Sequence, residues 1–264
     1  MHIAGYLAAV LIGVSLGLIG GGGSILTVPV LVYLFGINPL LSTSYSLFVV
    51  GSTSLVGAFN NYRKGLVSIK TAFLFGLSSI TTVFLTRKFI IPAIPKIIAE
   101  IGGFTITESI FTMVLFAILM VIASISMIRN GSIKENVINN KKINLAKLLV
   151  YGTAIGFVTG LLGAGGGFLL IPTLVLLVKL PMKEAVGTSL LIIALNSLIG
   201  FTGDLGHFSM DWKFLLTITA IAVVGIFAGG VLAKKIPGEK LKKGFGWFVL
   251  LMGLYIIGKE IFFR

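Results

Sequence analysis

The chain is a succession of ten apolar runs separated by short polar stretches, a pattern that points to a membrane. The runs lie near 3–19, 25–36, 43–59, 69–86, 108–128, 147–162, 168–178, 185–201, 213–233 and 242–262. Most approach the roughly 20 residues that an α-helix needs to cross a bilayer. Only 11% of the residues are charged, against about 25% in a soluble domain. We therefore predict an all-α polytopic protein of the cytoplasmic membrane, surrounded by the lipid bilayer.

Charge and rare residue types exclude several classes of function. The net charge of +13 comes from basic residues clustered between the apolar runs. This distribution is typical of cytoplasmic loops. The sequence has no basic face with interleaved aromatic residues, so it does not predict binding of nucleic acid. The chain has no cysteine and only two histidines, His2 and His207. We therefore predict no metal site and no cofactor.

The two halves of the chain repeat each other. A shift of 143 positions aligns Gly20, Gly22, Gly23 and Pro29 with Gly163, Gly165, Gly166 and Pro172. Chance matches of leucine and valine are common between apolar sequences, but several glycines and one proline in register indicate a duplication. We predict a first repeat over 1–128, a cytoplasmic linker over 129–147 and a second repeat over 148–264.

The distribution of basic residues predicts the orientation of the repeats. The linker 129–147 and the trio Arg63, Lys64 and Lys70 belong inside by the positive-inside rule, and the loop 203–212 with Asp204 belongs outside. Each half then has five segments that enter the membrane from opposite sides, as in transporters with inverted-topology repeats. The same scheme places Arg87, Lys88 and Lys96 outside, which counts against it.

Two glycine clusters precede the runs at 25–36 and 168–178, which are too short to span a bilayer. The motifs are GGGGSILTVP at 20–29 and GAGGGFLLIP at 163–172. Consecutive glycines disfavour a helix, so each cluster predicts a break followed by a half-helix that begins near Ser24 or Gly167. The free N–H groups and the positive dipole end of a half-helix favour an anion, and no basic residue lies in the flanking segments. The predicted binding residues are Gly21, Gly22, Gly23, Ser24, Gly165, Gly166 and Gly167.

Polar side chains in the segments after the half-helices extend the predicted anion site. Ser44 and Ser46 in the first half, and Thr188 and Ser189 in the second, could donate hydroxyl hydrogen bonds without a buried charge. The alternative is that these hydroxyls bond to their own helical turn. Asn196 is costly to expose to lipid, so we expect it to face the protein interior, in the site or beside it.

The paired motifs at 20–29 and 163–172, each followed by a helix start rich in serine and threonine, resemble the TauE/SafE family of sulfite exporters and anion permeases. The sequence AVGTSL at 185–190 is similar to the family pattern, whereas STSYSL at 42–47 departs from it. The resemblance covers nearly the whole chain. It implies transport of sulfite, organosulfonates or related anions.

The function predicted from the sequence is a secondary carrier that moves a small sulfur-containing oxyanion by alternating access. A passive anion channel is the alternative, because paired half-helices also line pores. A membrane-embedded enzyme would need a nucleophile with its base or a metal cluster, and the sequence suggests neither. A structural subunit is a third alternative. The sequence leaves open the identity of the anion, the direction of transport, any coupling ion and the oligomeric state, for which a homodimer is one candidate.

Overall fold

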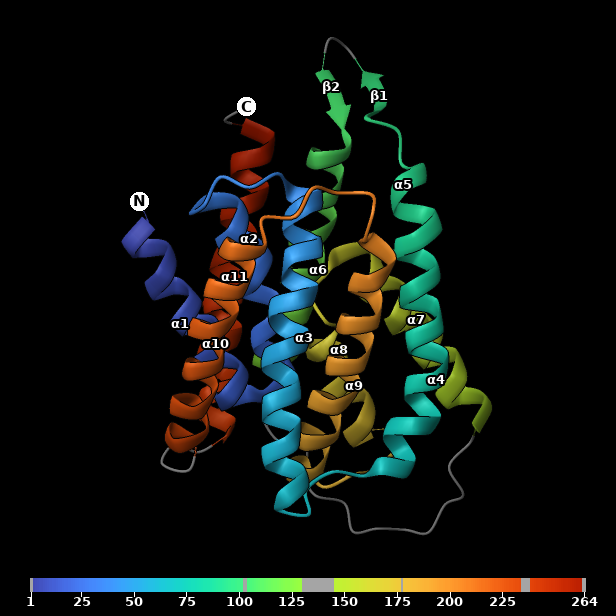
Figure 1. Ribbon diagram of the computed structural model, residues 1–264, viewed down its shortest axis with the longest axis vertical. Helices are drawn as coiled ribbons and strands as arrows, with labels where there is room; N and C mark the ends of the chain where they lie inside the picture. The colour runs from blue at the N-terminus through green and yellow to red at the C-terminus, as the bar shows by residue number, and fades with distance from the viewer. Residues whose placement is uncertain (1, 102–103, 130–144, 177, 234–237, 263–264) are drawn as a thin grey trace.

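The computed structural model describes residues 2–101, 104–129, 145–176, 178–233 and 238–262, and these form a bundle of helices (Figure 1). Five described helical segments are long and apolar enough to cross a membrane, and the predicted runs agree closely with the observed helices. The first half contains α1 (His2–Ile19), η1 (Gly20–Leu26), α2 (Thr27–Tyr33), α3 (Pro39–Arg63), α4 (Ile69–Leu85), η2 (Thr86–Ile90), α5 (Ile91–Ala93) and α6 (Glu108–Arg129). The second contains α7 (Leu145–Leu162), α8 (Gly167–Leu176), α9 (Met182–Asp204), α10 (Trp212–Leu232) and α11 (Gly238–Phe262).

Side-chain caps fix the starts of several long helices. The Asn38 carboxamide oxygen accepts a hydrogen bond from the Leu40 amide at 2.9 Å, directly before α3. Asp211 accepts from the Phe214 amide at 3.0 Å and begins α10 in the same way. Caps of this kind satisfy amides that have no partner inside the helix.

One short segment departs from the predicted all-α architecture. Strands β1 (Ile97–Ile101) and β2 (Phe104–Thr107) form an antiparallel hairpin that projects beyond the helices (Figure 1). The segment is rich in isoleucine and threonine, whose branched side chains favour extended backbone. Only 97–101 and 104–107 are affected, and the rest of the described fold is helical apart from the turns and connections.

Helices from the two halves interleave in the bundle. α1 packs along α10, α7 packs along α4, and α3 contacts α9. Equivalent helices run in opposite directions in Figure 1: α1 and α3 descend, whereas α7 and α9 ascend. Each half therefore completes its packing with helices of the other half.

Close glycine contacts occur in pairs that are exchanged by the shift of 143 positions. In each pair, the shift of 143 positions converts the two residues of one contact into the two residues of the other contact. The contacts of a β-carbon built on each glycine include Gly57 with Leu190 and Gly200 with Leu47, Gly57 with Ile226 and Gly200 with Val83, and Gly13 with Ala222 and Gly156 with Ser79. Gly13 and Gly156 thus let two helices approach closely, as small residues do in membranes.

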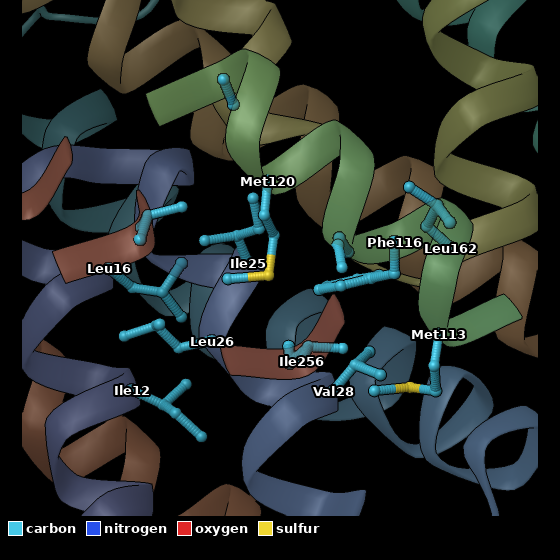
Figure 2. Close-up of a cluster of buried hydrophobic side chains, with 14 of the residues drawn as sticks. Ile12, Leu16, Ile25, Leu26, Val28, Met113, Phe116, Met120, Leu162 and Ile256 are labelled. Atoms are coloured by element: carbon cyan, nitrogen blue, oxygen red, sulfur yellow. The ribbon is translucent and has the colours of Figure 1, made fainter. Parts of the chain in front are cut away.

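A large apolar cluster packs around the first glycine segment. Met120 of α6 lies beside Ile25 of η1, and Met113 of α6 lies beside Val28 of α2 (Figure 2). The same cluster includes side chains of α1, α2, α7 and α11, among them Ile12, Leu16, Val28, Leu162 and Ile256. The glycine segment is therefore held inside protein, where an irregular backbone is tolerated at membrane depth.

Candidate functional site

The second glycine segment interrupts the helix between α7 and α8. Gly163, Gly165 and Gly166 have φ values of +66°, +67° and +67°, which L-residues rarely adopt. α8 begins at Gly167, so the predicted half-helix start is confirmed there. A β-carbon at Gly166 would also lie only 2.1 Å from the Thr159 hydroxyl oxygen. Both backbone conformation and available space therefore require glycine at this position.

This break leaves several buried amides without a backbone acceptor. Within the described residues, the Gly163 amide donates to the Thr159 carbonyl at 2.8 Å, but no backbone hydrogen bond starts from the amides of Ala164, Gly165 or Gly166. All three residues are buried. Successive amides in a turn can line a concave anion-binding site, and the start of α8 adds its partial positive charge.

The first glycine segment differs from the prediction. Residues Gly20–Leu26 form a 3₁₀-helix, and the α-helix starts at Thr27. The predicted free helix start at Ser24 is therefore wrong, because the 3₁₀ turns supply acceptors to the following amides. The Thr27 amide, for example, donates to the Ser24 carbonyl. Without side chains, the glycines permit the tighter winding of this helix.

The two glycine segments touch each other. A β-carbon at Gly21 would lie 2.6 Å from the Gly167 Cα atom, and one at Gly167 would lie 2.1 Å from the Gly21 carbonyl oxygen. The Ser24 hydroxyl is within hydrogen-bonding reach of the Gly21 carbonyl, at 2.7 Å, and of the Ala164 carbonyl. The breaks are thus neighbours at the centre of the protein.

The remaining predicted glycines lie in different surroundings. A β-carbon at Gly23 would meet Ser15 and Leu16 of α1, so Gly23 serves the packing of η1 on α1. A β-carbon at Gly165 would approach Ile193 and Val50 at 2.9 Å and the Ser197 hydroxyl oxygen at 3.3 Å. Gly22 lies within η1, and its surroundings fall outside the described part of the structure.

The predicted hydroxyl and amide residues divide into bonded and unbonded groups. Thr188 accepts a hydrogen bond from the Ser68 amide at 2.9 Å, and Ser189 donates to the Val186 carbonyl of its own helix at 2.8 Å. Ser189 therefore has the alternative role considered in the sequence analysis, which is a hydrogen bond within its own helical turn. The Asn196 amide nitrogen donates to Ser79 at 2.6 Å, which joins α9 to α4.

Several other buried polar atoms are unbonded at the contact of α3 with α9. The Asn196 carboxamide oxygen has no hydrogen-bond partner within the described structure, and neither do the hydroxyls of Ser44, Ser46, Thr53, Ser54 and Ser197. All of these residues are completely buried. Unsatisfied buried polar atoms are unusual in folded proteins and are typical of a functional site.

The sequence analysis missed a buried ion pair. Arg87 and Asp204 were expected in outer loops, but their side chains are only 0% and 1% exposed, and Arg87 Nη1 lies 3.2 Å from Asp204 Oδ2. Arg87 Nη1 also donates to the Thr43 hydroxyl at 3.0 Å. Arg87 is held in a π-helical turn, η2, which continues α4 past the predicted end of its run. Arg87 directly follows the predicted apolar run at 69–86, and Asp204 lies close to the end of the run at 185–201. This position is the only signal of their burial in the sequence.

The described residues contain no group of three or more histidine, cysteine, aspartate or glutamate side chains placed to bind a metal ion. The described polar groups at the centre include backbone amides, hydroxyls and Arg87 with its carboxylate partner. These groups are suited to holding an oxyanion by hydrogen bonds.

The chain is similar to known membrane transporter proteins along nearly its whole length. The profile of the family described as sulfite exporter TauE/SafE matches residues 5–256. A probable membrane transporter protein of Xylella fastidiosa strain 9a5c is 28% identical over 255 residues, covering 95% of this chain and 92% of the relative. The probable membrane transporter protein YdhB of Bacillus subtilis is 24% identical over 251 residues, covering 95% and 98% of the two chains. No solved structure gives a significant match.

Proposed function

Because the chain belongs to the sulfite exporter TauE/SafE family and is a multi-pass protein of the cell membrane, we propose that it is a secondary carrier for a small sulfur-containing oxyanion such as sulfite or an organosulfonate. The observation that carries this proposal is the row of buried amides at 164–166 before α8, which have no backbone acceptor among the described residues. Such a row attracts negative charge through its N–H groups.

The proposed site lies where the two glycine segments meet. Gly21, Gly165 and Gly167 let the oxyanion approach the backbone, and the unbonded hydroxyl of Ser197 beside Gly165 offers a further donor. Ser24 bridges the two segments in this conformation. In the proposed cycle the two segments move apart, so that the anion replaces the contact between them.

Alternating access in this proposal rests on two inverted-topology repeats. The paired glycine contacts support a two-fold relation between the halves, and the opposite directions of α1 and α7, and of α3 and α9, support an axis in the membrane plane. Rocking of one half against the other would then expose the central site to each side in turn.

The same arrangement supports the proposed orientation. α3 ends at Arg63 and α6 ends at Arg129 on the same side of the bundle, and α4 and α7 begin on that side (Figure 1). By the positive-inside rule this side is cytoplasmic. Arg87 no longer counts against the orientation, because it is buried within the bundle and paired with Asp204.

Transport in proteoliposomes tests the proposal. Vesicles loaded with unlabelled sulfite should accumulate external ³⁵S-sulfite by saturable counterflow, which a passive channel does not produce. Flux that does not saturate would favour the channel. A protein that ignores sulfite, sulfate and sulfonates but moves cations would refute anion transport altogether.

A further inference from the structure

The Arg87 guanidinium uses only part of its hydrogen-bonding capacity. Nη1 serves both Asp204 and Thr43, at 3.2 Å and 3.0 Å. Nε and Nη2 have no partner among the described residues, although the side chain is completely buried. Asp204 likewise uses one carboxylate oxygen, and its Oδ1 atom is unbonded.

This geometry leaves one edge of the guanidinium available to a ligand. A guanidinium presents five N–H donors in a rigid fork, and the fork matches two oxygens of a carboxylate, sulfonate or phosphate. A buried ion pair is stable when its remaining donors are also satisfied. A small oxyanion would supply the missing acceptors, because it carries several oxygens.

Arg87 also lies next to the second glycine segment. Thr43 accepts from Arg87 through its hydroxyl, and its carbonyl oxygen would be 2.3 Å from a β-carbon at Gly163. A β-carbon at Gly203 would in turn lie 3.0 Å from the Arg87 Cβ atom. The π-helical turn η2 holds Arg87 in this place, and such turns occur often at functional sites.

The ion pair joins the two halves of the duplicated chain, and the repeat contains no second copy of it among the described residues. The shift of 143 positions aligns Arg87 with Gly230 and Asp204 with Asn61. Asn61 instead donates to the Gly57 carbonyl of its own helix at 2.8 Å, and a β-carbon at Gly230 would meet no atom within 4 Å. The duplication therefore does not account for the pair, which departs from the internal repeat.

We infer that Arg87 binds the oxyanion through Nε and Nη2, on the side of the glycine segments where α9 ends. This inference rests on the proposed carrier function. Asp204 positions the guanidinium through Nη1. It also limits the net positive charge, so that the anion is bound weakly enough to leave. The Ser44 hydroxyl lies beside the Asp204 carboxylate and helps to hold it in place.

The test compares the full-length wild-type protein with three variants by ³⁵S-sulfite counterflow and by thermal unfolding in detergent with sodium sulfite or sodium chloride at equal ionic strength. R87K keeps the charge but loses the fork. R87Q/D204N removes both charges, so it leaves no unpaired ion. K88Q removes a neighbouring exposed charge and is the matched control.

We expect R87K to raise the KM for sulfite by roughly tenfold to a hundredfold, the equivalent of a lost charge-assisted hydrogen bond. R87Q/D204N should unfold near the wild-type temperature without sulfite and lose the stabilisation that sulfite gives, whereas K88Q should match the wild type. If R87Q/D204N has the wild-type KM and the wild-type stabilisation by sulfite, the Arg87–Asp204 pair is only structural and the inference is wrong. If that variant does not fold, an unchanged KM in R87K overturns the inference.

The wild-type measurement separates this inference from the proposed function. A wild type that is neither stabilised by sulfite, sulfate or a sulfonate nor able to transport one refutes the carrier and the role of Arg87 together. A wild type that transports sulfite while R87K and R87Q/D204N do so with equal KM refutes the role of Arg87 alone.

Discussion

The contact between the two glycine segments can be tested with a single added methyl group, in Gly167→Ala. A β-carbon at Gly167 would lie 2.1 Å from the Gly21 carbonyl oxygen and 2.3 Å from the Gly21 Cα atom, whereas ordinary contacts are 3.4–4 Å. The obstructing atoms belong to the backbone and cannot rotate away. The segments must therefore separate by more than about 1 Å, which is a change similar to overpacking a core.

The expected loss of stability follows from that displacement. Overpacking costs about 1–3 kcal/mol. For a chain of this size each 1 kcal/mol lowers Tm by about 2–4 °C, so Gly167→Ala should lower Tm by about 2–12 °C. Thermal unfolding in detergent, followed by the fluorescence of Trp212 and Trp247, measures this change. Sulfite counterflow should fall in the same variant, because the added methyl group occupies the proposed site.

Gly230→Ala provides the matched control, because a β-carbon there meets no atom within 4 Å. It should leave Tm unchanged or raise it slightly, since alanine favours a helix by up to about 1 kcal/mol. Gly21→Ala combined with Gly167→Ala should be less harmful than the sum of the two, because the first methyl group already separates the segments. If Gly167→Ala equals Gly230→Ala in Tm and transport, the segments do not touch as described.

Three further changes test other parts of the site. Gly165→Val should abolish sulfite counterflow while membrane insertion persists, because the residue has a φ of +67° and a β-carbon would lie 2.9 Å from Ile193; normal flux would contradict the proposed site. Asn196→Leu should destabilise the protein by about 1–3 kcal/mol, since its 2.6 Å bond to Ser79 is lost, and Asn196→Leu with Ser79→Ala should recover part of the loss in a thermal unfolding assay. Ser24→Ala should lower Tm by removing the hydrogen bond between the glycine segments, and an unchanged Tm would show that this bond contributes nothing.

The helices and their interruptions could be predicted from the sequence because the signals are local. Apolar run length determines which segments can span a bilayer, and runs of four or more small residues rich in glycine disfavour a regular α-helix. Gly167 was accordingly identified as the start of a half-helix. The first cluster differs because glycine also permits a 3₁₀-helix, and η1 is enclosed by its packing against α1 and α8.

Only the tertiary structure determined what the buried polar groups contact. Arg87 and Asp204 are 117 residues apart, and the charge pattern assigned both to outer loops. Their burial depends on the π-helical turn and on the packing of η2 against α9, which no local signal specifies. The contact of Gly21 with Gly167 depends equally on how the halves interleave. A local sequence pattern determines where the backbone breaks, but long-range packing decides which groups the breaks bring together.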